Sequence, residues 1–218
     1  MPVRLFEHIL YAVLFVGFVG SGALAAQEGK SPMAPRNLAV ATFAGGCFWC
    51  VESDFDQVPG VLRTISGYTG GTLKDPTYQQ VSKGGTGHYE AVQIHYDPAK
   101  ITYPALVDIF WRSVDPTDGD GQFCDRGDSY KTAIFVNSME EKLQAENSKR
   151  AVEQSGVLED PIVTPILVAG PFYPAEDYHQ NYYKENPLKY KFYRYRCGRD
   201  ARIRSLWGEQ AHRGIEKH

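Results

Sequence analysis

The sequence predicts an α+β fold, a two-layer α/β sandwich of the ferredoxin-like or α/β-roll type, with helices packed on a mixed, mainly antiparallel sheet. Three observations support this prediction. Short apolar runs typical of strands are interspersed with stretches of helical periodicity. Several connections between them are too short for parallel crossovers. Hydrophobic residues make up 43% and charged residues 22% of the 218 residues, which is typical of a globular chain.

Periodicity and turn residues predict each element in order along the chain. The first half begins with a strand at 38–43 that leads into two glycines, and a helix beginning near Cys47 with Phe48, Val51 and Phe55 on one face follows. A strand at 61–68 and a short helix at 76–81, with proline in its first turn, come next. A strand at 89–96 and a helix at 102–114 complete this half. In the second half the elements are a strand at 132–136, a helix that begins at a Ser138–Glu141 capping box and ends near Gly156, a strand at 162–168, and an irregular, aromatic C-terminal tail after Pro171.

The N-terminus is predicted to lie outside the fold. An apolar run at 9–19 follows Arg4, and Ala23-Leu24-Ala25 matches the small-x-small cleavage pattern of secretory signal peptides. We therefore expect a cleaved signal peptide at 1–25, a polar linker at 26–36, a single domain at 37–218 and an exported, periplasmic location. The alternative is an uncleaved membrane anchor, because the uncharged stretch from Ile9 to Ala26 has 18 residues, the lower limit for spanning a bilayer.

The formal net charge of −3 argues against a nucleic-acid or anionic-membrane partner. The segment from Lys184 is basic and aromatic, but we interpret it as a flexible segment that delivers Cys197. Gly198, directly after that cysteine, permits movement of the backbone.

Cys47 is the first candidate for chemistry. It follows Gly45-Gly46 at the start of a predicted helix, where free N–H groups and the helix dipole favour negative charge. This position is expected to lower the pKa of the thiol and to make Cys47 a nucleophile. The alternative is a small buried hydrophobic residue, a common environment for a free cysteine.

Cys47 and Cys50 form a C-x-x-C motif, which is typical of thioredoxin-like redox pairs and of half a zinc site. A zinc site is disfavoured, because no second C-x-x-C exists and the other cysteines and histidines lack paired spacing. A thioredoxin fold is disfavoured because Thr164-Pro165, which resembles the Thr-Pro of such sites, lies more than a hundred residues further along.

Glu90 is the second candidate. In a strand at 89–96 it shares a face with Val92, Ile94 and Tyr96, and burial there would raise its pKa enough to let it donate a proton near neutrality. The alternative is a partly buried glutamate paired with an arginine. Asp125 and Tyr130 lie in a glycine-containing loop at 124–130, and loops often carry functional residues.

These residues together resemble the A-type peptide-methionine (S)-S-oxide reductases over essentially 37–208. The resemblance rests on Gly46-Cys47-Phe48-Trp49-Cys50, Ser66-Gly67-Tyr68-Thr69-Gly70-Gly71, Pro76-Thr77-Tyr78, Thr86-Gly87-His88-Tyr89-Glu90, Tyr96-Asp97-Pro98, Asp115-Pro116-Thr117 and the segment from Asp125 to Tyr130.

The resemblance implies a reaction and a role for each site residue. Cys47 attacks the sulfur of the S epimer of methionine sulfoxide, in proteins or free, and Glu90 protonates its oxygen. Tyr78, Asp125 and Tyr130 position that oxygen, while Phe48 and Trp49 hold the methyl group. Cys47 becomes a sulfenic acid. Cys197 then forms a disulfide with Cys47, which a thioredoxin-like partner reduces. The family uses no metal or organic cofactor, and we assume a monomer.

Two residues depart from the usual family pattern. Tyr89 stands where a small residue is common, and Cys124 is an extra thiol in the 124–130 loop. Cys50 and Cys124 therefore leave the resolving role open, although we favour Cys197 because a thiol on a mobile tail can approach Cys47.

Two other functions are weighed against this one. The chain could be a general thiol–disulfide oxidoreductase that uses Cys47 and Cys50, or a non-enzymatic binding module with structural disulfides.

Overall fold

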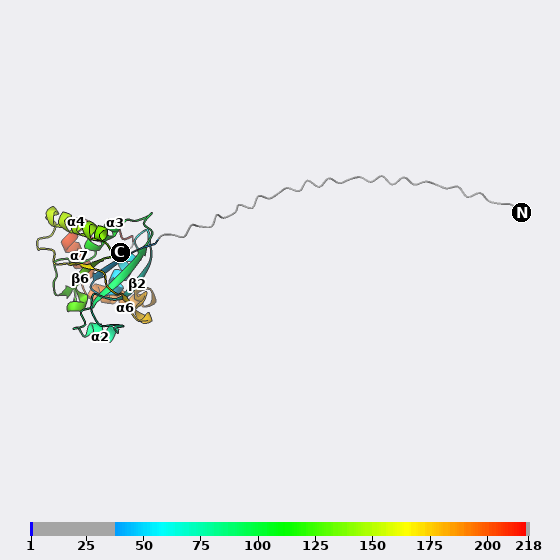
Figure 1. Ribbon diagram of the computed structural model, residues 1–218, viewed down its shortest axis with the longest axis horizontal. Coiled ribbons are helices and arrows are strands. Elements are labelled where there is room, and N and C mark those ends of the chain that lie inside the picture. The colour runs from blue at the N-terminus through cyan, green and yellow to red at the C-terminus, as the bar shows by residue number, and fades with distance from the viewer. Residues whose placement is uncertain (2–37, 217–218) are drawn as a thin grey trace. The chain divides into compact units, whose positions relative to one another are not determined.

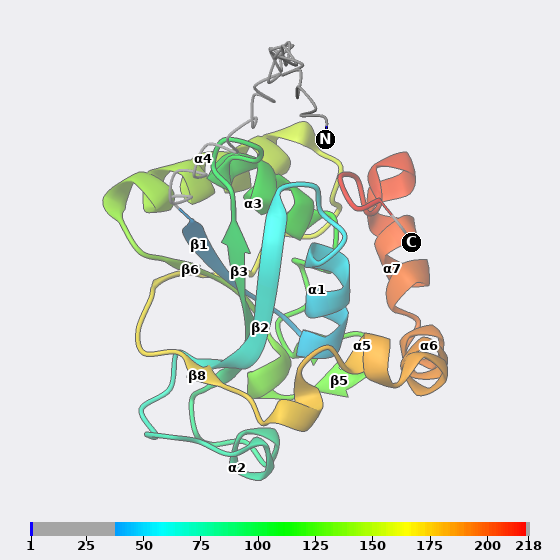
Figure 2. The same cartoon turned by 90° about the vertical axis from the view of Figure 1, so that its right-hand side faces the viewer.

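A six-stranded sheet forms one layer of the domain (Figures 1 and 2). The strands are β1 (Ala39–Gly45), β2 (Val61–Thr69), β3 (Tyr89–Tyr96), β6 (Thr132–Val136), β7 (Ile166–Val168) and β8 (Tyr173–Pro174), in the order β7-β6-β1-β3-β2-β8. Neighbouring strands are antiparallel, except that β6 and β7 are parallel. The predicted mixed, mainly antiparallel sheet is confirmed. A separate ribbon pairs β4 (Gly121–Gln122) with β5 (Asp125–Arg126).

Helices form the second layer. They are α1 (Phe48–Phe55), α2 (Tyr78–Ser82), α3 (Tyr103–Trp111), α4 (Met139–Ser155), α5 (Tyr182–Glu185), α6 (Pro187–Arg196) and α7 (Arg199–Trp207), with short 3₁₀ turns at Asp128–Tyr130, Asp177–His179 and Gly208–Gln210. Figure 2 shows α7 beside α1, whereas α2 lies at the end of the domain opposite α3 and α4.

The main core lies between the helices and one face of the sheet. Because side chains alternate along a strand, Phe43, Val92 and Ile134 face this core from three neighbouring strands. Alternate residues such as Ala44, Ala91 and Phe135 form a smaller cluster on the opposite face. This arrangement confirms the two-layer prediction.

The prediction of an irregular C-terminal tail is wrong. Helix α6 begins with Pro187 in its first turn, a position that needs no backbone N–H. In α7, Arg199, Ile203 and Trp207 are buried at a spacing of four residues, which is helical periodicity. The predicted strand at 162–168 is shorter than expected, because only Ile166–Val168 pairs with β6.

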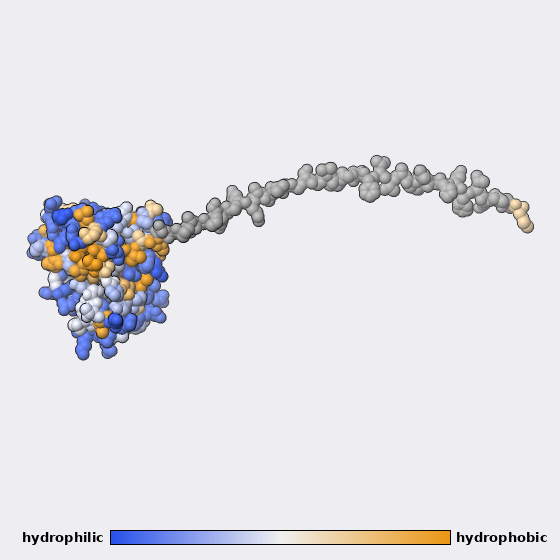
Figure 3. Space-filling model, viewed as in Figure 1, coloured by the Kyte–Doolittle hydropathy of each residue, from blue (hydrophilic) through white to orange (hydrophobic). Residues whose placement is uncertain are grey.

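The structure describes residue 1 and residues 38–216, so the predicted signal peptide and linker lie almost entirely outside the described residues. No helix in the described part is long and apolar enough to cross a membrane. The face of the domain seen in Figure 3 mixes hydrophilic and hydrophobic residues.

The turn from β1 into α1 depends on Gly46. Its φ of +80° lies in the left-handed region that favours glycine. A Cβ atom there would also lie 2.6 Å from Cβ of Gln122, in ribbon strand β4. This close approach directs the chain so that Cys47 becomes the N-cap residue of α1.

We expect Gly46→Ala to destabilise the domain more than Gly156→Ala, which serves as the matched control. Gly156 also has a positive φ, +66°, but nothing lies within 4 Å of its Cβ position. The control should therefore lose only the conformational term of about 1–2 kcal/mol. Gly46→Ala should lose about 1–3 kcal/mol more through overpacking against Gln122. Urea unfolding measures both, and equal losses would contradict the close contact.

Candidate active site

A small cavity of about 60 Å³ lies where the start of α1 meets the sheet and the β4–β5 ribbon. Its lining residues are Cys47, Phe48, Trp49, Tyr78, Glu90, Asp125, Tyr130 and Tyr193. The structure thus brings together seven of the eight residues that the sequence singled out. The eighth, Cys197, is not among the lining residues.

Cys47 is a free thiol with only 6% of its surface exposed. Burial raises the pKa of the Cys47 thiol well above its ordinary value, and Cys50, Glu90 and Asp125 raise it further. The expectation that the helix N-terminus lowers this pKa is therefore wrong. The physical reason is that burial and nearby negative groups outweigh the dipole, and the first N–H of α1, from Phe48, is donated to Glu90 at 3.0 Å.

Cys50 lies one turn further along α1 and is also free and buried. Its hydrogen bond with Cys47 lowers the pKa of the Cys50 thiol to about 7, against the opposing effect of burial and with help from Arg199 and Arg194. Of the two thiols in the motif, Cys50 therefore holds the negative charge more readily in this state.

Glu90 stands at the start of β3, and only 2% of its surface is exposed. Strand β3 lies between β1 and β2, so its first residues lie beside the turn that leads to α1. Burial raises the pKa of Glu90 to about 8, with further increases from Asp125 and Cys50. Among the residues described, no arginine or lysine forms an ion pair with Glu90, which disfavours the structural alternative. Glu90 is thus a protonated carboxyl beside a thiol.

Two tyrosines and Asp125 complete the polar part of the cavity. Tyr78 and Tyr130 both line the cavity, and burial raises the pKa of both phenols. The Tyr193 hydroxyl donates to Oδ2 of Asp125. Burial raises the pKa of Asp125 despite this bond and the nearby Arg199. These groups line the same cavity as Glu90, where they could hydrogen-bond a polar oxygen of a bound molecule.

Aromatic rings form the apolar wall of the cavity. The Phe48 ring is buried, 6.5 Å from the Tyr78 ring. The Trp49 indole stacks on Tyr182 with ring centroids 3.7 Å apart and donates its N–H to Nδ1 of His179 at 3.1 Å. Both side chains thus pack against neighbouring aromatic rings.

Sequence reasoning missed Tyr193, Tyr182 and His179. Tyr193 lies one helical turn before Cys197 and one turn after the buried Tyr190. Recognising Pro187 as a helix start would have placed Tyr190, Tyr193 and Cys197 on one face of that helix. No sequence signal singled out His179, because the histidines of the chain lack the paired spacing typical of a metal site.

Cys197 is bonded to Cys124 in this structure. The Cys47–Cys197 bond that the resemblance implies is therefore absent from this structure. Cys124, the extra cysteine of the 124–130 loop, is the disulfide partner of Cys197 instead. Cys124, Asp125 and Cys197 lie within 4.8 Å of one another, as metal ligands would. Two of the three are joined as a disulfide, however, and offer no thiolate to a metal.

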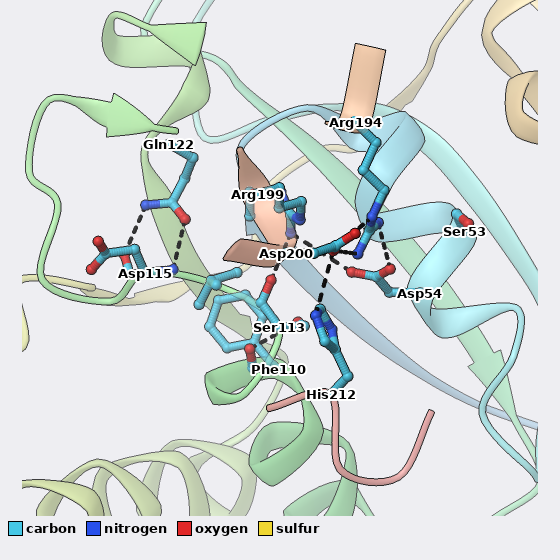
Figure 4. A network of polar contacts seen from close by, with 12 residues as sticks. Ser53, Asp54, Phe110, Ser113, Asp115, Gln122, Arg194, Arg199, Asp200 and His212 are labelled. Atoms are coloured by element: carbon cyan, nitrogen blue, oxygen red, sulfur yellow. Dashed lines mark hydrogen bonds and ion pairs between the residues drawn. The ribbon is translucent and has the colours of Figure 1, made fainter. Parts of the chain in front are cut away.

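A buried ionic network attaches the C-terminal helices to α1 (Figure 4). Nη1 of Arg194, from α6, lies 2.7 Å from Oδ1 of the fully buried Asp54. Arg199, from α7, lies 3.8 Å from the other oxygen and donates to the carbonyls of Gly45 and Ser113. Asp200 pairs with Arg194 at 2.7 Å. The network positions the helix that carries Tyr193.

The arrangement suits reduction of a small polar group bound to sulfur. A buried thiol and a protonated carboxyl share one cavity, an arrangement in which one group can attack while the other can supply a proton. The aromatic wall accepts an apolar group next to them.

Comparisons with known proteins agree on one family. The model of the family described as peptide methionine sulfoxide reductase matches residues 39–211. The chain is 51% identical over 171 residues to a peptide methionine sulfoxide reductase MsrA of Bacillus licheniformis, covering 78% of this chain and 94% of the relative. It is 51% identical over 175 residues to MsrA 2 of Rhizobium meliloti, covering 80% and 86%.

Two solved structures share the fold. Methionine sulfoxide reductase A of Corynebacterium diphtheriae has a TM-score of 0.62 and 31% identity, covering 71% of this chain and 78% of that one. Reduced Mxr1 of Saccharomyces cerevisiae has a TM-score of 0.64 and 30% identity, covering 70% and 88%.

Replacing Glu90 with glutamine should change how stability depends on pH. Glu90 stays protonated in the folded state up to about pH 8 but ionises near 4.5 once unfolded. Its contribution to stability is fully present below its unfolded pKa and is lost as pH rises through its folded pKa. Wild type should therefore lose up to about 1.4 kcal/mol per pH unit between about pH 5 and 8 relative to Glu90→Gln.

Urea unfolding of both proteins across this pH range measures the difference. Other groups, including the buried Glu52, titrate in both proteins and cancel. A difference that stays constant with pH would show that Glu90 is ionised in the folded state.

Proposed function

The chain belongs to the peptide methionine sulfoxide reductase family, and on this premise we propose that it reduces the S epimer of methionine sulfoxide, in proteins and as the free amino acid, to methionine. The observation that carries the proposal is the placement of the Cys47 thiol and the protonated Glu90 carboxyl in one small cavity with an aromatic wall.

The proposed first step is attack of Cys47 sulfur on the sulfoxide sulfur. The sulfoxide sulfur carries partial positive charge, and its approach favours the thiolate of Cys47, whose pKa is otherwise raised by burial. Glu90 supplies a proton to the sulfoxide oxygen, and the proton that the Cys47 thiol gives up returns to Glu90, which is therefore protonated again after the step. That oxygen passes to Cys47, methionine leaves, and Cys47 becomes a sulfenic acid.

The remaining lining residues orient the substrate. We assign Tyr78, Tyr130 and Asp125 to the sulfoxide oxygen, because they supply the polar groups around Glu90. Phe48 and Trp49 are assigned to the methyl group, because their rings form the apolar wall. Tyr193 joins this set through its hydrogen bond to Asp125.

A disulfide with a second cysteine of the chain then replaces the sulfenic acid, and a thioredoxin-like dithiol protein reduces it. No metal or organic cofactor is required by this scheme, and we propose that the protein acts as a monomer.

The general thiol–disulfide oxidoreductase is the second candidate. It requires Cys47 to meet a disulfide of another protein. Cys47 and Cys50 are 6% and 2% exposed, so neither sulfur is accessible to a folded protein in this state. Their burial favours the small sulfoxide group as the substrate.

A single-turnover assay tests the proposed reaction. Pre-reduced protein is mixed with each epimer of a blocked methionine sulfoxide, and the methionine formed is quantified. Only the S epimer should give product, and Cys47→Ser should give none. Glu90→Gln should slow the reaction by about 100-fold or more, because the proton donor is lost. No methionine from either epimer would reject the proposal and favour disulfide exchange.

We also propose that the protein is exported to the periplasm after removal of residues 1–25. The support is the apolar run followed by Ala23-Leu24-Ala25 in the sequence. Mass spectrometry of the chain isolated from the periplasm should find an N-terminus close to Ala26. An intact N-terminus in the membrane fraction would favour the uncleaved anchor instead.

A further inference from the structure

We propose that Cys124 is the exit thiol of the catalytic cycle, which takes the disulfide over from Cys197 and presents it at the surface to a dithiol protein. This inference rests on the proposed function and deepens it, because it assigns the route by which reducing equivalents reach the buried site.

The first argument is accessibility. Cys47 is almost fully buried and packs in a cluster with Cys50 and Tyr190, beside Trp49 and Tyr193. Thiol–disulfide exchange requires the attacking sulfur to reach the disulfide, which a folded reductant cannot do inside this cavity. Cys124 is exposed and Cys197 is half-buried. The Cys124–Cys197 bond is therefore more accessible than any bond made by Cys47.

The second argument is position. Cys124 directly precedes Asp125, which lines the cavity, and Cys197 lies one helical turn after Tyr193, which also lines it. Both sulfurs lie 3.9 Å from the Asp125 carboxylate, Cys124 from Oδ1 and Cys197 from Oδ2. The disulfide thus flanks the cavity wall whose inner side faces Cys47.

The third argument is the hinge beside Cys197. Gly198 has a φ of +69°, and no heavy atom lies within 4 Å of its Cβ position. Directly after it, Arg199 is anchored to the carbonyls of Gly45 and Ser113. Arg194, three residues before Cys197, is held by Asp54 and Asp200. We therefore place the movement of Cys197 toward Cys47 in the short turn between Arg194 and Arg199.

The exchange balances without a further reagent. Cys197 thiolate attacks the sulfur of the Cys47 sulfenic acid, a Cys47–Cys197 bond forms, and hydroxide leaves as water after taking a proton. Cys124 thiolate then attacks Cys197 sulfur, which breaks that bond and releases Cys47 with its electron pair. Protonated Glu90, on the Cys47 side, is the source of the proton that the departing sulfur takes up. A dithiol protein finally reduces Cys124–Cys197 and becomes a disulfide itself.

The structure has the bonding pattern of the last intermediate in this sequence. Cys124 and Cys197 are joined, while Cys47 and Cys50 are free thiols. In this state Cys47 is already able to meet a second sulfoxide before the reductant arrives. The competing route is attack by the Cys50 thiol on the Cys47 sulfenic acid. Cys50 lies close to Cys47 in the first turn of α1, where its backbone N–H donates to the Cys47 carbonyl oxygen at 3.0 Å.

Disulfide mapping during one turnover separates the two routes. Fully reduced protein receives one equivalent of the S sulfoxide, is quenched with acid at successive times and alkylated, and its disulfides are identified by mass spectrometry. Cys47–Cys197 should appear first and Cys124–Cys197 should replace it. A Cys47–Cys50 bond in their place would overturn the proposal. Absence of methionine in wild type would instead reject the proposed function.

Cys124→Ser gives a second test with Cys50→Ser as the matched control. Cys124→Ser should stop at Cys47–Cys197. Its turnover with thioredoxin, relative to its turnover with the small reductant dithiothreitol, should fall by about tenfold or more, because only the small reductant reaches the buried bond. In Cys50→Ser the same ratio should stay within about twofold of wild type. An unchanged ratio in Cys124→Ser would overturn the proposal.

Discussion

The buried carboxylate of Asp54 is the constraint on which the arrangement of the site depends. It lies on α1, fully shielded from water, where an uncompensated charge would cost several kcal/mol. Arg194 and Arg199 compensate it from α6 and α7. A buried ion pair adds little net stability compared with apolar packing, but loss of one partner is strongly destabilising. The pairing therefore acts mainly by specifying where the C-terminal helices dock, and with them Tyr193 and Cys197.

The same burial explains the charge state of the reacting groups. Burial keeps both the Cys47 thiol and the Glu90 carboxyl neutral near pH 7. Two neutral groups tolerate a buried aromatic cavity better than two anions would. Under the proposed mechanism, Cys47 becomes charged only when the sulfoxide sulfur, with its partial positive charge, lies against it, and Glu90 already carries the proton that the sulfoxide oxygen takes up.

Burial also distinguishes the Cys47 thiol from the Cys124–Cys197 disulfide, because Cys47 is buried whereas Cys124 is exposed. Under the proposed cycle, a protein reductant does not reach Cys47 inside this cavity, and it reduces the more exposed Cys124–Cys197 pair instead. Asp125 lies between the two regions and contacts both: it lines the cavity, and its carboxylate lies 3.9 Å from each sulfur of the Cys124–Cys197 bond. The Tyr193 hydroxyl donates a hydrogen bond from α6 to the same carboxylate. Asp125 therefore contacts the disulfide, the cavity and α6 at once.

The sequence by itself determined the features that depend on short-range pattern. The period of two in β3 placed Glu90 on the core-facing side, and the two glycines before Cys47 indicated the strand–turn–helix geometry of the nucleophile. Only the tertiary structure decided which thiols pair, the direction of the pKa shift at Cys47 and the helical form of the C-terminus. These depend on distances between residues far apart in the chain, such as Asp54 and Arg194, and on burial, which a local pattern does not specify.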